Sequence, residues 1–413
     1  MLRKTILLVA GFASILPAQS QTRRELIEEA RTQKAARLEP DAPGTWEQRL
    51  ILVKDNKVIE RITAGYRGVR VKMGGMPNGS GFALGPNYFR DDLARGELVL
   101  DTSLQASTRR WLKYEVLFRA PSFAGNKLFW ESSAIHQDYN SLDYYGPGPD
   151  SEKTGRSNYR LEDTSFDTLF GVRPFKYLRL GTGVGYLLTN VGRGQNDRFI
   201  SADRQFSSVP AMQEQTNFFR TGVLGQFDYR DTPAGARSGG NYLVRYDHFN
   251  DNADRGFNFQ RLDFEAQQYI PFFNKRRVIA LRARSLQTFT SADNRVPFYQ
   301  QAVLGGDDLR GFRPYRFQDS NMMAFSAEYR WEVFSGLDMA VFGDAGQVSP
   351  KRWYVNLNSI ETSVGFGLRF NARNAPFLRL DVGFSHEGFQ IFMRFREIWA
   401  QRPRSTSSAP HIY

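Results

Sequence analysis

One arginine and one carboxylate stand out as residues whose types and surroundings could carry chemistry. Arg310 lies in a glycine-rich connection, where Gly305, Gly306 and Gly311 permit tight or left-handed backbone turns. Asp344 lies in a later segment of alternating apolar and polar residues. A guanidinium keeps its charge and presents a planar fork of donors, so it can bind a carboxylate through two hydrogen bonds. The alternative is an ordinary loop arginine and an ordinary acid on a polar strand face.

Patterns for catalysis or metal binding are weak. The chain has no cysteine, which excludes a thiolate metal site and a cysteine nucleophile. Gly181, Gly183 and Gly185 have the spacing of a phosphate loop, but they belong to a strand pattern with no helix after it. The four histidines are scattered at His136, His248, His386 and His411. We therefore predict no enzyme, no metal site and no cofactor. A barrel hydrolase acting on lipids through a serine and histidine on separate strands stays an alternative.

The elements that must position these residues are strands. From about Tyr66 onward, apolar and polar residues alternate, as where Leu380 and Val382 share one face and Arg379 and Asp381 the other. Sixteen such segments begin near residues 67, 80, 96, 110, 127, 159, 177, 217, 240, 258, 277, 321, 337, 359, 377 and 388. Most span about ten residues, the length that a tilted strand needs to cross a bilayer.

The connections alternate in length. One set is short: 91–95, 121–126, 172–176, 231–239, 271–276, 334–336 and 372–376. The other set holds the long ones, 138–158, 191–216, 251–257, 291–320 and 348–358, beside three short members near 76, 107 and 387. Short turns on one rim and long loops on the other are typical of outer-membrane barrels. A sheet in lipid must close, because lipid cannot satisfy the polar groups of an open edge. The sequence therefore predicts an all-β fold, a 16-stranded antiparallel transmembrane β-barrel with short N-terminal periplasmic helices.

The ends of the chain differ from this pattern. Residues 1–20 combine a basic start, a short apolar core and small residues at cleavage spacing, which indicates a signal peptide. Residues 21–64 are rich in helix formers and are expected to be a short periplasmic helical segment. Residues 65–397 would form the barrel in the bacterial outer membrane. Residues 398–413 are expected to be a disordered polar tail.

The net charge of +12, from 55 basic and 43 acidic residues, raises the question of nucleic acid binding. The basic residues are interleaved with acids on polar strand faces, and no compact basic helix or aromatic platform stands out. A charged lumen wall explains these arginines, so we predict no nucleic acid partner.

Two segments resemble the signatures of a known family. Leu309-Arg310-Gly311-Phe312 is similar to the V-R-G-F loop of the BamA and TamA type of outer-membrane assembly barrels, the bacterial surface antigen family. Its second signature, F-x-D-x-G on a strand, is matched by Phe342, Asp344 and Gly346. The resemblance covers roughly residues 66–397.

The resemblance implies that loop 291–320 folds into the lumen and carries Arg310 to Asp344, with Phe312 and Phe342 shielding the pair. It also implies a protein that inserts or moves proteins, or lipids, into or across the outer membrane without covalent chemistry. The expected partners are outer-membrane lipids, lipopolysaccharide and an unidentified protein or lipid client. A substrate-selective diffusion channel is the alternative. Residues 21–64 are too short for the family's periplasmic POTRA domains, so the resemblance is to a POTRA-less member that leaves room for a separate periplasmic accessory protein.

A seam between the first and last strands is the second expected site. The resemblance implies that this seam opens laterally toward lipid. Gly74 and Gly75 of the first strand weaken strand pairing there, and Gly388 and Phe395 bound the last strand.

Overall fold

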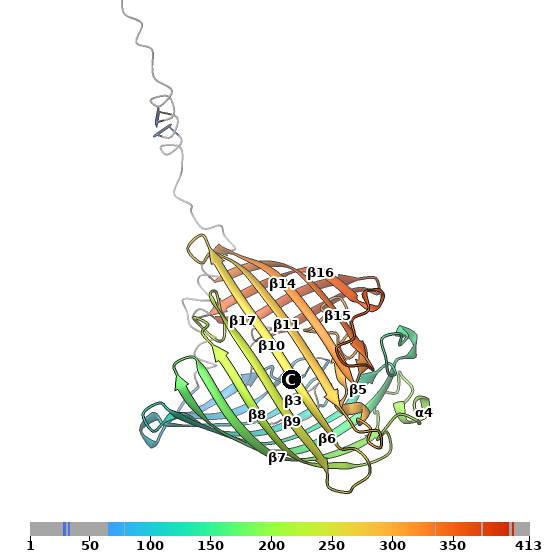
Figure 1. The fold of residues 1–413 in the computed structure, drawn as a ribbon. Helices are drawn as coiled ribbons and strands as arrows, with labels where there is room; N and C mark the ends of the chain where they lie inside the picture. Colours follow the sequence, from blue (N-terminus) through green and yellow to red (C-terminus); the bar gives the residue numbers. More distant parts are fainter. Residues whose placement is uncertain are drawn as a thin grey trace, which may run out of the picture. The chain divides into compact units, whose positions relative to one another are not determined.

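The fold is one long curled sheet. The computed structural model describes residues 28–29, 32–33, 65–77, 79–334, 336–372, 375–395 and 399. Sixteen antiparallel strands follow one another in chain order, and a separate two-stranded hairpin, β12 and β13, lies in the connection before β14 (Figure 1). Residues 28–29 and 32–33 are helical. The expected signal peptide, the rest of segment 21–64 and all of 398–413 except Trp399 lie outside the described residues.

The elements have the following bounds. The sheet consists of β1 (Val69–Met73), β2 (Ala83–Leu93), β3 (Leu98–Ser107), β4 (Leu112–Phe123), β5 (Leu128–Tyr144), β6 (Ser157–Phe175), β7 (Leu178–Arg193), β8 (Thr216–Asp228), β9 (Gly239–Asp251), β10 (Phe259–Phe272), β11 (Arg277–Phe289), β14 (Asn321–Phe334), β15 (Leu337–Ser349), β16 (Glu361–Ala372), β17 (Ala375–Ser385) and β18 (Gly388–Arg394). The shorter elements are β12 (Ala302–Leu304), β13 (Phe317–Asp319), α4 (Ala202–Gln205), η1 (Ala94–Gly96), η2 (Lys153–Gly155), η3 (Phe298–Gln300) and η4 (Leu357–Ser359).

Strand β16 shows why these segments form a barrel wall. Val364 and Phe366 are 63% and 48% exposed on the outer face, whereas Ser363 and Arg369 are buried on the inner face. Successive side chains of a strand point to opposite faces, so an alternating sequence makes a wall that is apolar outside and charged inside. Among the described residues, no helix is long and apolar enough to cross a membrane.

The predicted fold class is confirmed, and each strand of the sheet begins within three residues of its predicted start.

The connection predicted between β5 and β6 was too long. Strand β5 continues to Tyr144, whose ladder partner is Ser157 of β6, so the connection predicted at 138–158 is limited to 145–156. Aromatic and polar residues mix there and hide the period of two, but ladder hydrogen bonds to β6 keep the backbone extended. The hairpin of β12 and β13 was not predicted.

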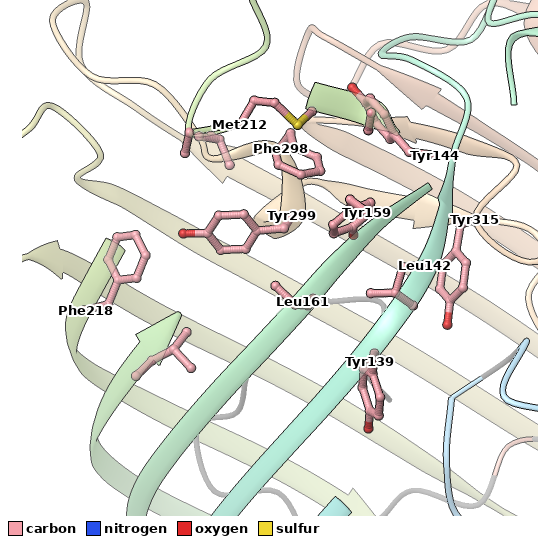
Figure 2. Close-up of a cluster of buried hydrophobic side chains, with 14 of the residues drawn as sticks. Tyr139, Leu142, Tyr144, Tyr159, Leu161, Met212, Phe218, Phe298, Tyr299 and Tyr315 are labelled. Carbon is pink, nitrogen blue, oxygen red and sulfur yellow. The ribbon is translucent and has the colours of Figure 1, made fainter. Parts of the chain in front are cut away.

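An aromatic cluster fills the barrel near the rim that carries the long connections (Figure 2). Phe298 in the connection between β11 and β14 is fully buried, and its ring centroid lies 5.2 Å from that of Tyr144 and 4.8 Å from that of Tyr159. Tyr144 and Tyr159 belong to β5 and β6, so this connection packs against the inner wall on the far side of the lumen.

Strands β1 and β18 are the two ends of the sheet, and no ladder joins them within the described residues. Their ends nevertheless approach. A Cβ built on Gly74 would lie 3.3 Å from the Cβ of Phe395, and the rings of Phe82 and Phe395 are 5.5 Å apart. Gly75 follows with a left-handed backbone. Gly388 is the first residue of β18 and has nothing near its Cβ position, so the structure does not bring it to this contact.

Candidate functional site

The loop between β12 and β13 forms a tight tip that only glycine allows. Gly305 has a φ of +124°, and a Cβ there would lie 2.3 Å from the carbonyl oxygen of Arg313. Gly306 has a φ of +66° and pairs with Leu309 in an isolated bridge. This geometry presents Arg310 at the turn that follows.

Arg310 binds two carboxylates inside the barrel. Its Nε and Nη2 donate to the two oxygens of Asp344 over 2.9 and 2.7 Å, and its backbone N–H donates to Asp344 Oδ2 over 3.1 Å. Its Nη1 donates to Oε2 of Glu328 over 2.6 Å. All three side chains are buried to 97% or more. This is the contact that the family resemblance implied for Arg310 and Asp344, and Glu328 is an additional partner.

The two phenylalanines play different parts. The guanidinium carbon of Arg310 lies 3.4 Å from the ring centroid of Phe342, so Phe342 covers one face of the ion pair. Phe312 points elsewhere: its ring lies 5.3 Å from those of Phe317 and His386. With Leu309 it belongs to a buried apolar cluster between the loop and the wall. Phe312 therefore anchors the loop rather than shielding the pair.

Close backbone approach fixes the loop tip against β16 and β17. A Cβ on Gly311 would lie 2.6 Å from the carbonyl oxygen of Phe384 and 2.6 Å from Ser363 Cβ. A Cβ on Gly383 would lie 2.2 Å from the carbonyl oxygen of Arg310. The hydroxyl of Ser385 donates to the carbonyl oxygen of Gly311 over 2.9 Å. Gly346 is also confined, because its Cβ position lies 3.0 Å from Leu304 Cδ1 in β12.

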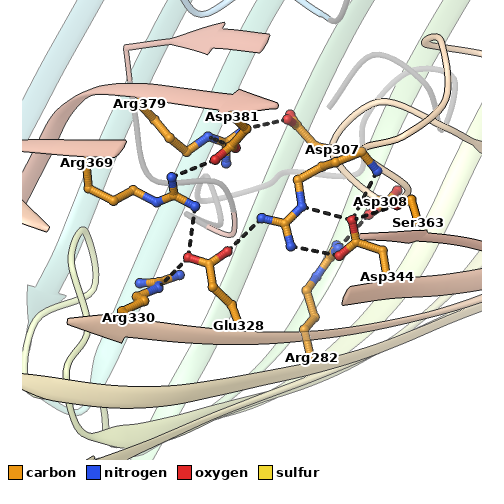
Figure 3. A network of polar contacts seen from close by, with 11 residues as sticks. Arg282, Asp307, Asp308, Glu328, Arg330, Asp344, Ser363, Arg369, Arg379 and Asp381 are labelled. Carbon is orange, nitrogen blue, oxygen red and sulfur yellow. Dashed lines mark hydrogen bonds and ion pairs between the residues drawn. The ribbon is translucent and has the colours of Figure 1, made fainter. Parts of the chain in front are cut away.

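The pair is part of a larger network along the wall (Figure 3). Glu328 also accepts from Arg330 over 2.7 Å and from Arg369 over 2.9 Å. The chain of contacts continues from Arg369 to Asp381 at 2.6 Å, from Asp381 to Arg379 at 2.8 Å and from Arg379 to Asp307 at 2.7 Å. The network thus holds four arginines and four carboxylates, and its last contact returns to the loop.

Sequence reasoning missed Glu328, Gly383 and Ser385. Glu328 alternates with apolar neighbours like many other acids of the polar strand faces, so no local pattern distinguishes it. Gly383 and Ser385 receive the loop from a strand about 70 residues later, a contact that only the folded barrel creates.

A cavity of about 630 Å³ lies toward the rim that carries the short connections. Its lining is charged and includes Arg119, Glu131, Arg173, Lys176 and Arg230. Within the described part of the chain, no group of three or more histidines or acids is arranged to hold a metal ion.

The fold and the site together define a class of protein: an antiparallel β-barrel with an apolar outer face and a loop pinned to its inner wall. The chain belongs to the Omp85 superfamily, because residues 96–396 match the family model described as the Omp85 superfamily domain. The family predicted from the two signatures is therefore confirmed, and no POTRA domain is present among the described residues.

Two solved structures show the same fold. BamA from Haemophilus ducreyi lacking POTRA domains 1–3 matches with a TM-score of 0.57 and 15% identity, over 80% of this chain and 69% of that one. CdiB from Escherichia coli matches with a TM-score of 0.54 and 12% identity, over 80% of this chain and 62% of that one. At these identities the likeness is one of fold. No curated protein matches the sequence.

Proposed function

We propose that this protein inserts or moves proteins, or lipids, into or across the bacterial outer membrane without covalent chemistry. Membership of the Omp85 superfamily and the likeness to BamA support this role. The observation that carries it is the loop tip held inside the barrel by Arg310, Asp344 and Glu328. A diffusion channel needs a continuous wet path, which a loop pinned inside the barrel obstructs.

The proposed surroundings follow from this role. Outer-membrane lipids and lipopolysaccharide would contact the apolar outer face, and the client would be a protein or a lipid. The rim with the short connections would face the periplasm, where a separate accessory protein could supply what POTRA domains do elsewhere in the family.

Removal of the protein from its native cells tests the assembly role. We expect specific proteins or lipids to be depleted from the outer-membrane fraction. Wild-type protein should restore them and Arg310→Ala should not. Arg313→Ala is the matched control, because Arg313 lies in the same loop and forms no ion pair among the described residues. An unchanged outer membrane after removal would contradict the proposal.

A substrate-selective diffusion channel is the second candidate, and the charged cavity of about 630 Å³ favours it. Single-channel conductance of the purified protein separates the two. The assembly role predicts low conductance that rises when residues 305–316 are deleted. A channel predicts a high and solute-dependent conductance already in the wild type.

A further inference from the structure

Trp399 lies beyond the last strand, yet its side chain is only 2% exposed. Its ring centroid lies 6.2 Å from that of Tyr269, and the guanidinium carbon of Arg330 lies 5.4 Å from it. Its carbonyl oxygen accepts a 3.1 Å hydrogen bond from Nε2 of Gln267. Gln267 and Tyr269 are buried residues of β10, whose neighbour Ile270 is 45% exposed on the outer face. Trp399 therefore packs against the inner face of β10 and β14.

The place that Trp399 occupies is a recess in this wall. Ala236, Val278 and Ala280 join Tyr269 and Trp399 in one buried cluster. The alanines leave space for a ring, while Tyr269 and Arg330 offer an aromatic face and a cation. We call Ala236, Gln267, Tyr269, Val278, Ala280 and Arg330 the Trp399 recess. It lies at the rim of the short connections, where β10 ends and β11 begins.

The contacts in the Trp399 recess do not require tryptophan. Gln267 binds a main-chain carbonyl, which any residue supplies. The ring contacts use an aromatic face, which phenylalanine and tyrosine also have. The indole Nε1 is buried without a hydrogen-bond partner within the described residues. Among the described residues, the recess therefore makes no contact that is specific to the indole nitrogen.

We propose that the Trp399 recess is a binding site for a polypeptide segment that carries an aromatic side chain, and that this chain occupies it through its own Trp399. This proposal rests on the proposed function, because a client polypeptide is the competing ligand. The cavity of about 630 Å³ adjoins the recess: Arg230 lines the cavity and donates to Oε1 of Gln267 over 3.3 Å. An arriving segment thus has open, charged space beside the recess.

The test uses the full chain with Trp399→Ala in detergent, which frees the recess. The probe is a fluorescent peptide of residues 396–402, Arg-Glu-Ile-Trp-Ala-Gln-Arg. We expect saturable binding of this peptide and of its Phe version, and binding at least about tenfold weaker for its Ala version. Wild-type protein should bind the probe at least about tenfold more weakly than the variant, because its recess is occupied. An unrelated Gly and Ser peptide with one Trp should compete with the probe.

Two further variants localise the binding. Adding Tyr269→Ala should abolish it, whereas adding Ile270→Ala on the outer face of the same strand should leave it unchanged. Equal binding of the Ala peptide, or no competition by the unrelated Trp peptide, would overturn the proposal, since the recess would then serve only as an anchor for the tail. Peptide binding is measured without a client or a membrane, so its failure leaves the proposed function standing. Conversely, an outer membrane that is unchanged after removal of the protein would refute that function without altering peptide binding.

Discussion

At the scale of single residues, the partners of each charged group in the site compensate for its burial. Arg310, Glu328 and Asp344 are all out of water, and burying an ion is unfavourable unless partners replace its hydration. Glu328 accepts from three arginines, so it keeps partners when any one of them is lost. Among the described residues, Asp344 has its ion pair with Arg310 and only the hydroxyl of Ser363, 3.3 Å away, as a further side-chain donor.

The two partners of Arg310 therefore predict unequal effects of mutation. Arg310→Ala leaves Asp344 buried without a counter-charge, and breaking a buried pair in this way costs about 3 to 5 kcal/mol. Asp344→Ala should cost less, because Arg310 keeps Glu328. We expect Arg310→Ala to lower the temperature of unfolding in heat-modifiability gels most, Asp344→Ala less, and Arg313→Ala hardly at all. Wild-type behaviour of both site variants would argue against pinning of the loop.

A second prediction concerns the closeness of the loop to the wall. Gly311→Ala places a methyl group 2.6 Å from the carbonyl oxygen of Phe384, so the tip must move. Overpacking of this kind costs about 1 to 3 kcal/mol. Gly343→Ala is the control, because its nearest atom is 4.0 Å away. Thermal unfolding in detergent should separate the two variants, and equal stability would show that the tip is not held tightly.

At the scale of elements, connections decide what the strands can do. The connection between β11 and β14 is more than a spacer, because the hairpin of β12 and β13 and the cluster around Leu309 and Phe312 give it a core of its own.

The connection between β8 and β9 on the other rim is organised by Asp231. One oxygen of this carboxylate accepts from the backbone N–H groups of Arg237 and Ser238, and the other binds Lys275 over 3.0 Å.

Asp231 makes the stability of this rim depend on acid. Burial alone would raise the pKa of Asp231, but donation from Lys275 and from the backbone outweighs it and lowers the pKa from 3.8 to about 2. Because the folded pKa is depressed, the stabilisation is full above about pH 4 and is lost as the pH falls through about 2. We expect Asp231→Asn to show a smaller loss of thermal stability between pH 4 and pH 2 than the wild type.

The control for Asp231 is an exposed acid on the opposite rim. Asp254→Asn, in the connection between β9 and β10, should retain the wild-type loss of stability in acid. If Asp231→Asn loses stability as steeply as the wild type, the hydrogen bonds of this turn do not contribute to the acid dependence.

At the scale of the whole barrel, the seam and the lumen are the two features on which the proposed function depends. The lumen is filled by aromatic side chains near one rim and contains the charged cavity toward the other. The contact between the sheet ends involves Gly74, Phe82 and Phe395. A seam without a continuous ladder is a weak line in the wall, because ladder hydrogen bonds hold neighbouring strands together.

A crosslink across this seam tests lateral opening. The chain has no cysteine, so Gly74→Cys with Phe395→Cys provides the only two thiols, at positions whose Cβ atoms would lie 3.3 Å apart. We expect oxidation to block the complementation of depleted cells and reduction to restore it. Each single cysteine variant should function under both conditions. Full function of the oxidised pair would exclude opening at this seam.

The strands were the most predictable part of the molecule, and the partners of the site were the least. Alternation is a local property, so Val364 and Arg369 could be assigned to opposite faces from the sequence. Arg310 and Asp344 were found through their resemblance to family signatures, and their contact could be expected from that alone. Glu328 and Gly383 could not, because their roles depend on the depth of the loop in the lumen. Phe312 was assigned the wrong neighbours for the same reason.

By itself, the sequence determined where the strands lie, their order along the chain and which face of each strand is apolar. These properties follow from the alternation of apolar and polar residues, which is local to each segment. Only the tertiary structure decided which inward side chains meet. Closing a sheet sets the stagger between strands, and this stagger fixes which charges face each other inside the barrel. The burial of Trp399 belongs to the same category, since a recess built from β10, β11 and β14 exists only after the wall has curved.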